Sequence, residues 1–83
     1  MLTRLTVNEA AKQIIVDSNI TQKKLAEKMN VKNQQTVFNM LNADKGMRTD
    51  NFIKMMDALG HDVIIRNRIN DSEIILVCKE EES

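Results

Sequence analysis

The segment TQKKLAEKMNVKNQQTVFNMLN, residues 21–42, decides the fold because it holds two short helical patterns separated by a turn. Apolar side chains recur at helical spacing within 22–29, and Thr21 precedes them as a helix N-cap. Asn30 follows where a left-handed C-terminal residue is needed, and asparagine tolerates that conformation better than most residues. A third helix is expected over about 33–42. Two short helices joined by a tight turn predict a helix-turn-helix.

Two more helices are expected to brace this pair. Thr6 and Glu9 form a capping-box pattern, which predicts a first helix over 6–19. Thr49 is expected to cap a fourth helix that Gly60 ends. The apolar residues expected to face inward are Val7, Ala10, Ala11, Ile14, Ile15, Leu25, Ala26, Met29, Val37, Met40, Leu41, Phe52, Ile53, Met56 and Leu59.

After Gly60 the pattern changes from helical to β periodicity. Residues 62–66 and 73–77 are rich in β-branched side chains, and 67–72 between them hold turn formers, which predicts a hairpin. Both hairpin faces are apolar, and its own helices can cover only one of them. The other face, or an open strand edge, should then find a partner, which predicts a homodimer. The alternative is a hairpin sandwiched inside its own domain. The residues expected to dimerise are Ile64, Ile74, Ile75, Leu76, Val77 and Cys78.

The charges divide along the chain although their sum is zero. Nine basic and five acidic side chains lie in residues 1–54, whereas three basic and seven acidic ones lie in 55–83. This division indicates a basic face for a polyanion and an acidic tail turned away from it. We expect a mainly α protein with a helix-turn-helix domain over 1–60 and a C-terminal hairpin with an acidic tail over 61–83.

The third helix carries an unusual number of amide side chains. Advancing by about 100° per residue from Val37 puts Gln35 near 160° and Asn39 near 200°, on the side opposite the apolar residues. Asparagine and glutamine can form two hydrogen bonds with adenine in a major groove. Polar residues can also simply coat a solvent face, but the segment 29–43 contains no acidic residue, which favours DNA. The side chains expected to read base edges are Asn33, Gln34, Gln35, Thr36, Phe38, Asn39 and Asn42.

Basic and polar residues flank this amide face and are expected to contact DNA phosphates. Such contacts position a protein on DNA without reading its sequence. The first turn of a helix also offers free backbone N–H groups to an anion. The predicted phosphate-contacting residues are Gln22, Lys23, Lys24, Lys28, Lys32, Lys45 and Arg48.

The pattern TQKKLAEKMNV…QTVFNMLN resembles the Xre/Cro-type helix-turn-helix family of bacterial and phage regulators. The resemblance covers about residues 6–60 and implies a four-helix lambda-repressor-like fold. Asn30 stands where the family usually has glycine, and the turn is about one residue longer than usual. The hairpin lies outside the family's core.

These features together predict a sequence-specific DNA-binding transcriptional regulator. It is expected to repress by binding a palindromic operator as a homodimer, with the two third helices about 34 Å apart. One alternative is a protein-binding module, antitoxin-like or a phage accessory protein, that clamps a partner with the hairpin. Another is a dimerising scaffold that has lost DNA binding, which the longer turn would support.

Neither an enzyme nor a cofactor or metal site is expected. His61 stands alone, and Cys78 alternates with apolar positions as a small hydrophobic residue would. The sequence contains no glycine-rich phosphate loop or other catalytic signature. A single cysteine, with neither a signal sequence nor a membrane-length apolar run, predicts a cytoplasmic protein.

Overall fold

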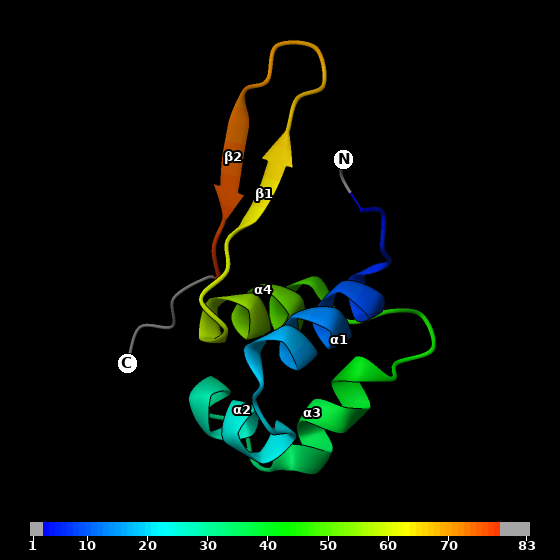
Figure 1. Cartoon of the computed structure of the whole chain (residues 1–83), viewed down its shortest axis with the longest axis vertical. Coiled ribbons are helices and arrows are strands. Elements are labelled where there is room, and N and C mark those ends of the chain that lie inside the picture. Colours follow the sequence, from blue (N-terminus) through cyan, green and yellow to red (C-terminus); the bar gives the residue numbers. More distant parts are fainter. Residues whose placement is uncertain (1–2, 79–83) are drawn as a thin grey trace.

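The computed structural model describes residues 3–78, which form four helices followed by a two-stranded antiparallel hairpin (Figure 1). The mainly helical fold with a C-terminal hairpin is therefore confirmed. The acidic tail predicted at 79–83 lies outside the described residues. The elements are α1 (Val7–Ser18), α2 (Gln22–Met29), α3 (Gln34–Leu41), α4 (Thr49–Ala58), β1 (Val63–Arg66) and β2 (Glu73–Leu76).

The first two helices begin at the predicted caps. The Thr6 hydroxyl accepts a hydrogen bond from Glu9 N at 3.2 Å, and Glu9 Oε1 accepts one from Thr6 N at 2.9 Å. The bond from Thr6 N, helped by the Thr6 hydroxyl and the Lys12 ammonium, holds the pKa of the Glu9 carboxyl below its ordinary value. The Thr21 hydroxyl accepts from the backbone N of the third α2 residue at 3.0 Å. Asn30 ends α2 in the left-handed region, with φ 57°.

The start of α4 differs from the prediction. Arg48, with an extended backbone, is its N-cap, and Thr49 is already the first helical residue. No side chain caps this end. The prediction took the Thr49 hydroxyl as the cap, but the first helical hydrogen bond runs from Phe52 N to the Arg48 carbonyl at 2.9 Å, which places the cap one residue earlier.

The core lies among the four helices, which pack their apolar faces together. It also includes Met55, which the sequence pattern did not select, whereas the predicted inward residue Val7 is 41% exposed. Val7 occupies the first turn of α1, where it borders an open hollow rather than another helix. The buried residues are Ala11, Ile15, Leu25, Ala26, Met29, Val37, Leu41, Met47, Ile53, Met55 and Met56.

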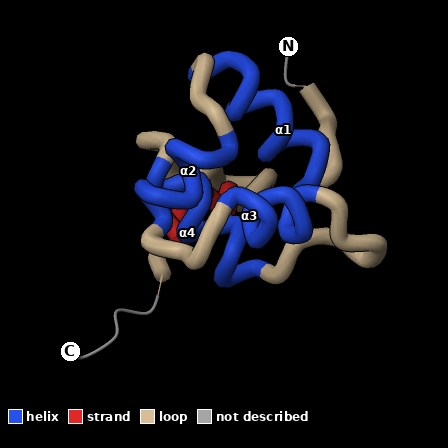
Figure 2. The backbone as a smooth tube through the Cα atoms, turned by 90° about the horizontal axis from the view of Figure 1, so that it is seen from below, coloured by secondary structure: helices blue, strands red, loops and turns tan. Residues whose placement is uncertain are grey.

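The hairpin projects from the helical body at the end opposite α2 and α3 (Figures 1 and 2). Its register pairs Val63 with Leu76, Ile64 with Ile75, Ile65 with Ile74 and Arg66 with Glu73. Because directly paired residues share a face, the first and third pairs lie on one face and the second on the other.

The helices cover much less of the hairpin than expected. Val63, at the start of β1, packs against the helical core, and its partner Leu76 is half-buried. Farther out, Ile65 and Ile74 on the same face are exposed. The helices therefore cover only the base of one face, because the strands extend away from them. The alternative of a hairpin sandwiched within the domain is excluded for the same reason.

None of the helices in residues 3–78 has the length and apolar character needed to cross a membrane.

Candidate nucleic-acid interface

The centre of the candidate interface is a pair of amides one turn apart on α3. Gln35 Nε2 donates a hydrogen bond to Asn39 Oδ1 at 3.0 Å, and both side chains are exposed. On the other side of the helix, Val37 and Leu41 are buried in the core. The core contacts therefore fix the rotation of α3 about its axis, and that rotation turns the amide pair outward.

Two of the predicted reading residues are hydrogen-bonded to each other at the start of α3. Asn33 is the N-cap, and its Oδ1 accepts from Thr36 N at 3.1 Å and from the Thr36 hydroxyl at 3.3 Å. Thr36 is half-buried. These bonds fix the first turn of the helix and occupy the side-chain oxygen of Asn33. Both residues therefore hold the helix that carries the amide pair, and do not add to the pair's exposed hydrogen-bonding groups.

Asn42 was predicted to read base edges, but it lies at the C-terminal cap of α3. It follows the last residue of α3, and its Nδ2 donates to the Phe38 carbonyl at 2.8 Å. Its Oδ1 accepts from Lys12 Nζ of α1 at 3.3 Å. The Asn42 amide thus closes the C-terminal end of α3 and connects it to α1. The Lys12 charge also lies where a helix C-terminus favours a cation.

Gln34 and Phe38 complete the exposed surface of α3. Phe38, one of the two aromatic residues in the chain, has 48% of its surface exposed and is not buried in the core. Gln34 is exposed and borders a hollow of about 390 Å³ between α2 and the turn. Lys23 of α2 and Lys32 of the turn border the same hollow. The structure therefore brings two predicted phosphate-contacting lysines to the N-terminal end of α3.

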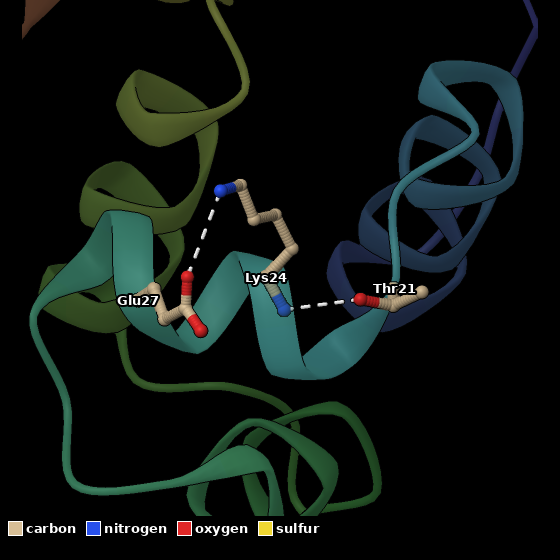
Figure 3. Close-up of polar contacts among 3 residues, drawn as sticks. All are labelled: Thr21, Lys24 and Glu27. Carbon is tan, nitrogen blue, oxygen red and sulfur yellow. Dashed lines mark hydrogen bonds and ion pairs between the residues drawn. The ribbon is translucent and has the colours of Figure 1, made fainter.

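The other two lysines of α2 lie elsewhere on that helix. Lys24 Nζ is 3.6 Å from Glu27 Oε1, and the Lys24 side chain extends away from α3 (Figure 3). Glu27 itself borders the hollow that Lys23 and Lys32 share. Lys28 borders a separate hollow of about 340 Å³, together with Ile20 and Leu59. Lys24 and Lys28 therefore do not gather with Lys23 around the amide pair.

Gln22, the first residue of α2, is half-buried. Its placement in the first turn puts it beside the N–H groups that a helix start leaves free.

Asn8 of α1 holds the loop that carries the remaining cations. Its Nδ2 donates to the Ala43 carbonyl at 3.2 Å, and its Oδ1 accepts from Met47 N at 2.8 Å. Lys45 and Arg48, both exposed, lie in and directly after this loop. Sequence reasoning did not identify Asn8, because its partners are 35 and 39 residues away and no local pattern indicates them.

The chemistry available at this surface is hydrogen bonding and charge attraction. Within residues 3–78, the acidic residue nearest the amide pair along the chain is Glu27 on one side and Asp44 on the other. No group of three or more His, Cys, Asp or Glu side chains in that range is placed to hold a metal ion.

Comparison with known proteins identifies no relative of the chain: no family model, curated protein or solved structure matches it. The resemblance to the Xre/Cro-type family therefore stays a prediction.

Proposed function

We propose that the chain binds double-stranded DNA and reads its sequence with α3. The observation that carries this proposal is the exposed pair Gln35 and Asn39, hydrogen-bonded to each other on a helix whose opposite side is buried. Glutamate and lysine favour a helix more strongly and are the usual choice for a solvent face. Amides combine donor and acceptor groups, which is what the edge of a base pair demands.

The hydrogen bond between the two amides arranges them to act together. Gln35 uses one Nε2 hydrogen on Asn39 Oδ1, which leaves Gln35 Oε1 as an acceptor and the Asn39 amide group as a donor. Adenine presents a donor at N6 and an acceptor at N7. We infer that the pair recognises an adenine, with Gln34 reading an adjacent base and Phe38 contacting a thymine methyl group.

Cations on two sides of α3 would hold the duplex in place. Lys23 and Lys32 lie at its N-terminal end, and the loop fixed by Asn8 presents Lys45 and Arg48. Contacts of this kind would attract DNA of any sequence and weaken steeply with salt. Lys24, close to Glu27, and Lys28, on another side of α2, would contribute less.

The cellular role that follows is transcriptional regulation, with repression by occupying a promoter as the simplest mechanism. The palindromic operator predicted from the sequence further requires two copies that present α3 to the same duplex. It remains a prediction that depends on how the copies join.

The proposal is tested by selecting bound fragments from random duplex DNA and measuring the affinity of variants for the selected site. Gln35→Ala is expected to cost about 1–3 kcal/mol at that site and to relax one base position. If Gln35→Ala bound every sequence as the unaltered chain does, α3 would not be the reading element.

A matched pair of lysine variants tests the orientation of α2. Lys23→Ala should weaken binding to all sequences and reduce the salt slope by about one. Lys28→Ala removes the same charge from the same helix and should change binding less. Equal effects would contradict the orientation proposed for α2. A chain without any steep salt dependence would instead be a protein-binding module or a scaffold.

A further inference from the structure

The hairpin exposes more apolar surface than any other part of the described chain. Six of its side chains are strongly exposed, and Ile65 and Ile69 among them were not in the predicted dimerisation set. They lie on both faces of the strands, and those of β2 and the turn lie beside the edge at which a further strand could pair. The six are Ile64, Ile65, Ile69, Ile74, Ile75 and Val77.

The outer edge of β2 offers unpaired backbone groups. Asn67 N donates to the Ser72 carbonyl at 2.8 Å, which identifies this pair as hydrogen-bonded. Bonded and non-bonded pairs alternate along an antiparallel ladder, so the Ile64–Ile75 pair is non-bonded. The N–H and C=O of Ile75 therefore point outward from β2. An isolated hairpin of this length is marginal, and a further strand at its edge stabilises it.

A hollow of about 290 Å³ lies at the base of the hairpin, between the end of β2 and α4. Apolar side chains of both elements line it, and two carboxylates, Asp57 and Asp62, lie at the same place. We call this the base hollow. Its main lining residues are Ile53, Asp57, Asp62, Ile75, Val77 and Cys78.

The opposite end of the hairpin, residues 67–72, carries groups of complementary chemistry. Ile69 is 94% exposed, more than any other large apolar side chain described in the chain. The turn is held by its own asparagines: Asn67 Oδ1 accepts from Ile69 N at 2.8 Å, and Asn70 Oδ1 accepts from Ser72 N at 3.0 Å. Arg68 is adjacent to Ile69. An ordered turn thus presents one apolar side chain beside one positive charge, with one carboxylate, Asp71, two residues after Ile69.

We infer that the hairpin binds a second copy of this chain through antiparallel pairing of the two β2 edges. Ile75 lies opposite Ile75 of the other copy, where the outward groups of both strands meet. Antiparallel pairing puts the tip of each hairpin beside the base of the other. Ile69 then enters the partner copy's base hollow, and Arg68 approaches the carboxylates of Asp57 and Asp62. This inference concerns the hairpin alone and does not depend on DNA binding.

The first test is the mass of the chain in solution, measured by sedimentation equilibrium over a range of concentrations. The 9.5 kDa chain should sediment at twice its mass. Ile69→Asn should weaken the dimer about tenfold or more. Val16→Asn is the matched control, since Val16 of α1 is 73% exposed and lies outside the hairpin. A monomeric chain, or a dimer unaffected by Ile69→Asn, would overturn the inference.

Charge reversal tests whether tip and base meet. Arg68→Glu and Asp57→Lys, made separately, should each weaken the dimer, because like charges then face each other. Combined in one chain they restore an attractive pair, so the double variant should dimerise better than either single variant. Additive weakening in the double variant would exclude the tip-to-base contact.

Cysteine cross-linking tests which edge pairs. In a Cys78→Ser chain, Ile75→Cys puts two thiols opposite each other at the symmetry axis, within reach of a disulfide. Ile64→Cys is the control, because Ile64 is paired with Ile75 on the same face but lies in β1. Mild oxidation should link the first variant into covalent dimers and not the second. Linking of the second alone, or of both equally, would overturn pairing through β2.

Discussion

The helical body and the hairpin use apolar residues in opposite ways. In the body, residues 7–60, the apolar positions converge on a core in which Leu25 and Val37 are fully buried. In the hairpin, the isoleucines alternate along both strands, yet Ile65 and Ile74 stay exposed on the same face. Local β preference is satisfied there, but the second layer that a sheet needs is missing. The difference teaches that the helices supply one another's packing surface, whereas the hairpin lacks a second layer that residues 3–78 do not supply.

The largest expected effect comes from deleting methyl groups in each region. Leu25→Ala should destabilise the fold by about 2–5 kcal/mol, because it leaves a cavity in the core. Ile74→Ala, measured in dilute solution, should cost much less, because Ile74 is already 64% exposed. Urea unfolding followed by circular dichroism gives both values. Equal costs at high dilution would show that the hairpin is buried within a single chain.

A second pair of variants compares long-range with local amide bonds. Asn8→Ala removes two partly buried hydrogen bonds that fasten the loop after α3, and should cost about 1–3 kcal/mol. Asn67→Ala removes bonds within the exposed turn and should cost less. Asn8→Asp is a useful control, because it keeps the acceptor for Met47 N but loses the donor to Ala43. Thermal unfolding should show the largest loss of stability for Asn8→Ala, an intermediate loss for Asn8→Asp and the smallest loss for Asn67→Ala.

The smallest effect concerns acid and is confined to the helical body. The pKa of Glu9 is lowered in the folded chain, so its stabilising effect is present at neutral pH. That effect is lost as the pH falls through the ordinary carboxyl range and below it. Amide chemical shifts of residues 6–9 should therefore follow a titration below pH ~4.3. Glu9→Gln should abolish that titration; a shift that persists in Glu9→Gln would assign it to another group.

Much of the fold could be predicted because several helix ends are determined by residues close together in the sequence. The capping box at Thr6, the Thr21 cap and the left-handed Asn30 each depend on neighbouring residues only. The start of α4 was misplaced by one residue because no side chain caps it, and the Thr49 hydroxyl belongs to the first helical residue. The direction of the hairpin also escaped prediction, since it depends on how the chain leaves α4 and not on strand periodicity.

The candidate site was predictable where α3 is regular. Helical geometry put Gln35 and Asn39 on one exposed face, and the structure has them bonded to each other there. The same extrapolation failed for Asn42, because the helix ends at Leu41 and 100° steps no longer apply. The α2 lysines were grouped by proximity in sequence. Lys28 is five positions after Lys23, which rotates it by about 140° around the helix axis.

The position of the hairpin relative to α3 has one more consequence. The two lie at opposite ends of a molecule whose longest extent is 42 Å (Figure 1). Antiparallel joining of two hairpins reverses one copy, so the two α3 helices would face outward in opposite directions. Such an assembly could not occupy successive grooves of one straight duplex, so this way of joining the copies would exclude the palindromic operator predicted from the sequence. It would instead bridge two distant segments and close the DNA between them into a loop, with the tether raising the local concentration of the second segment.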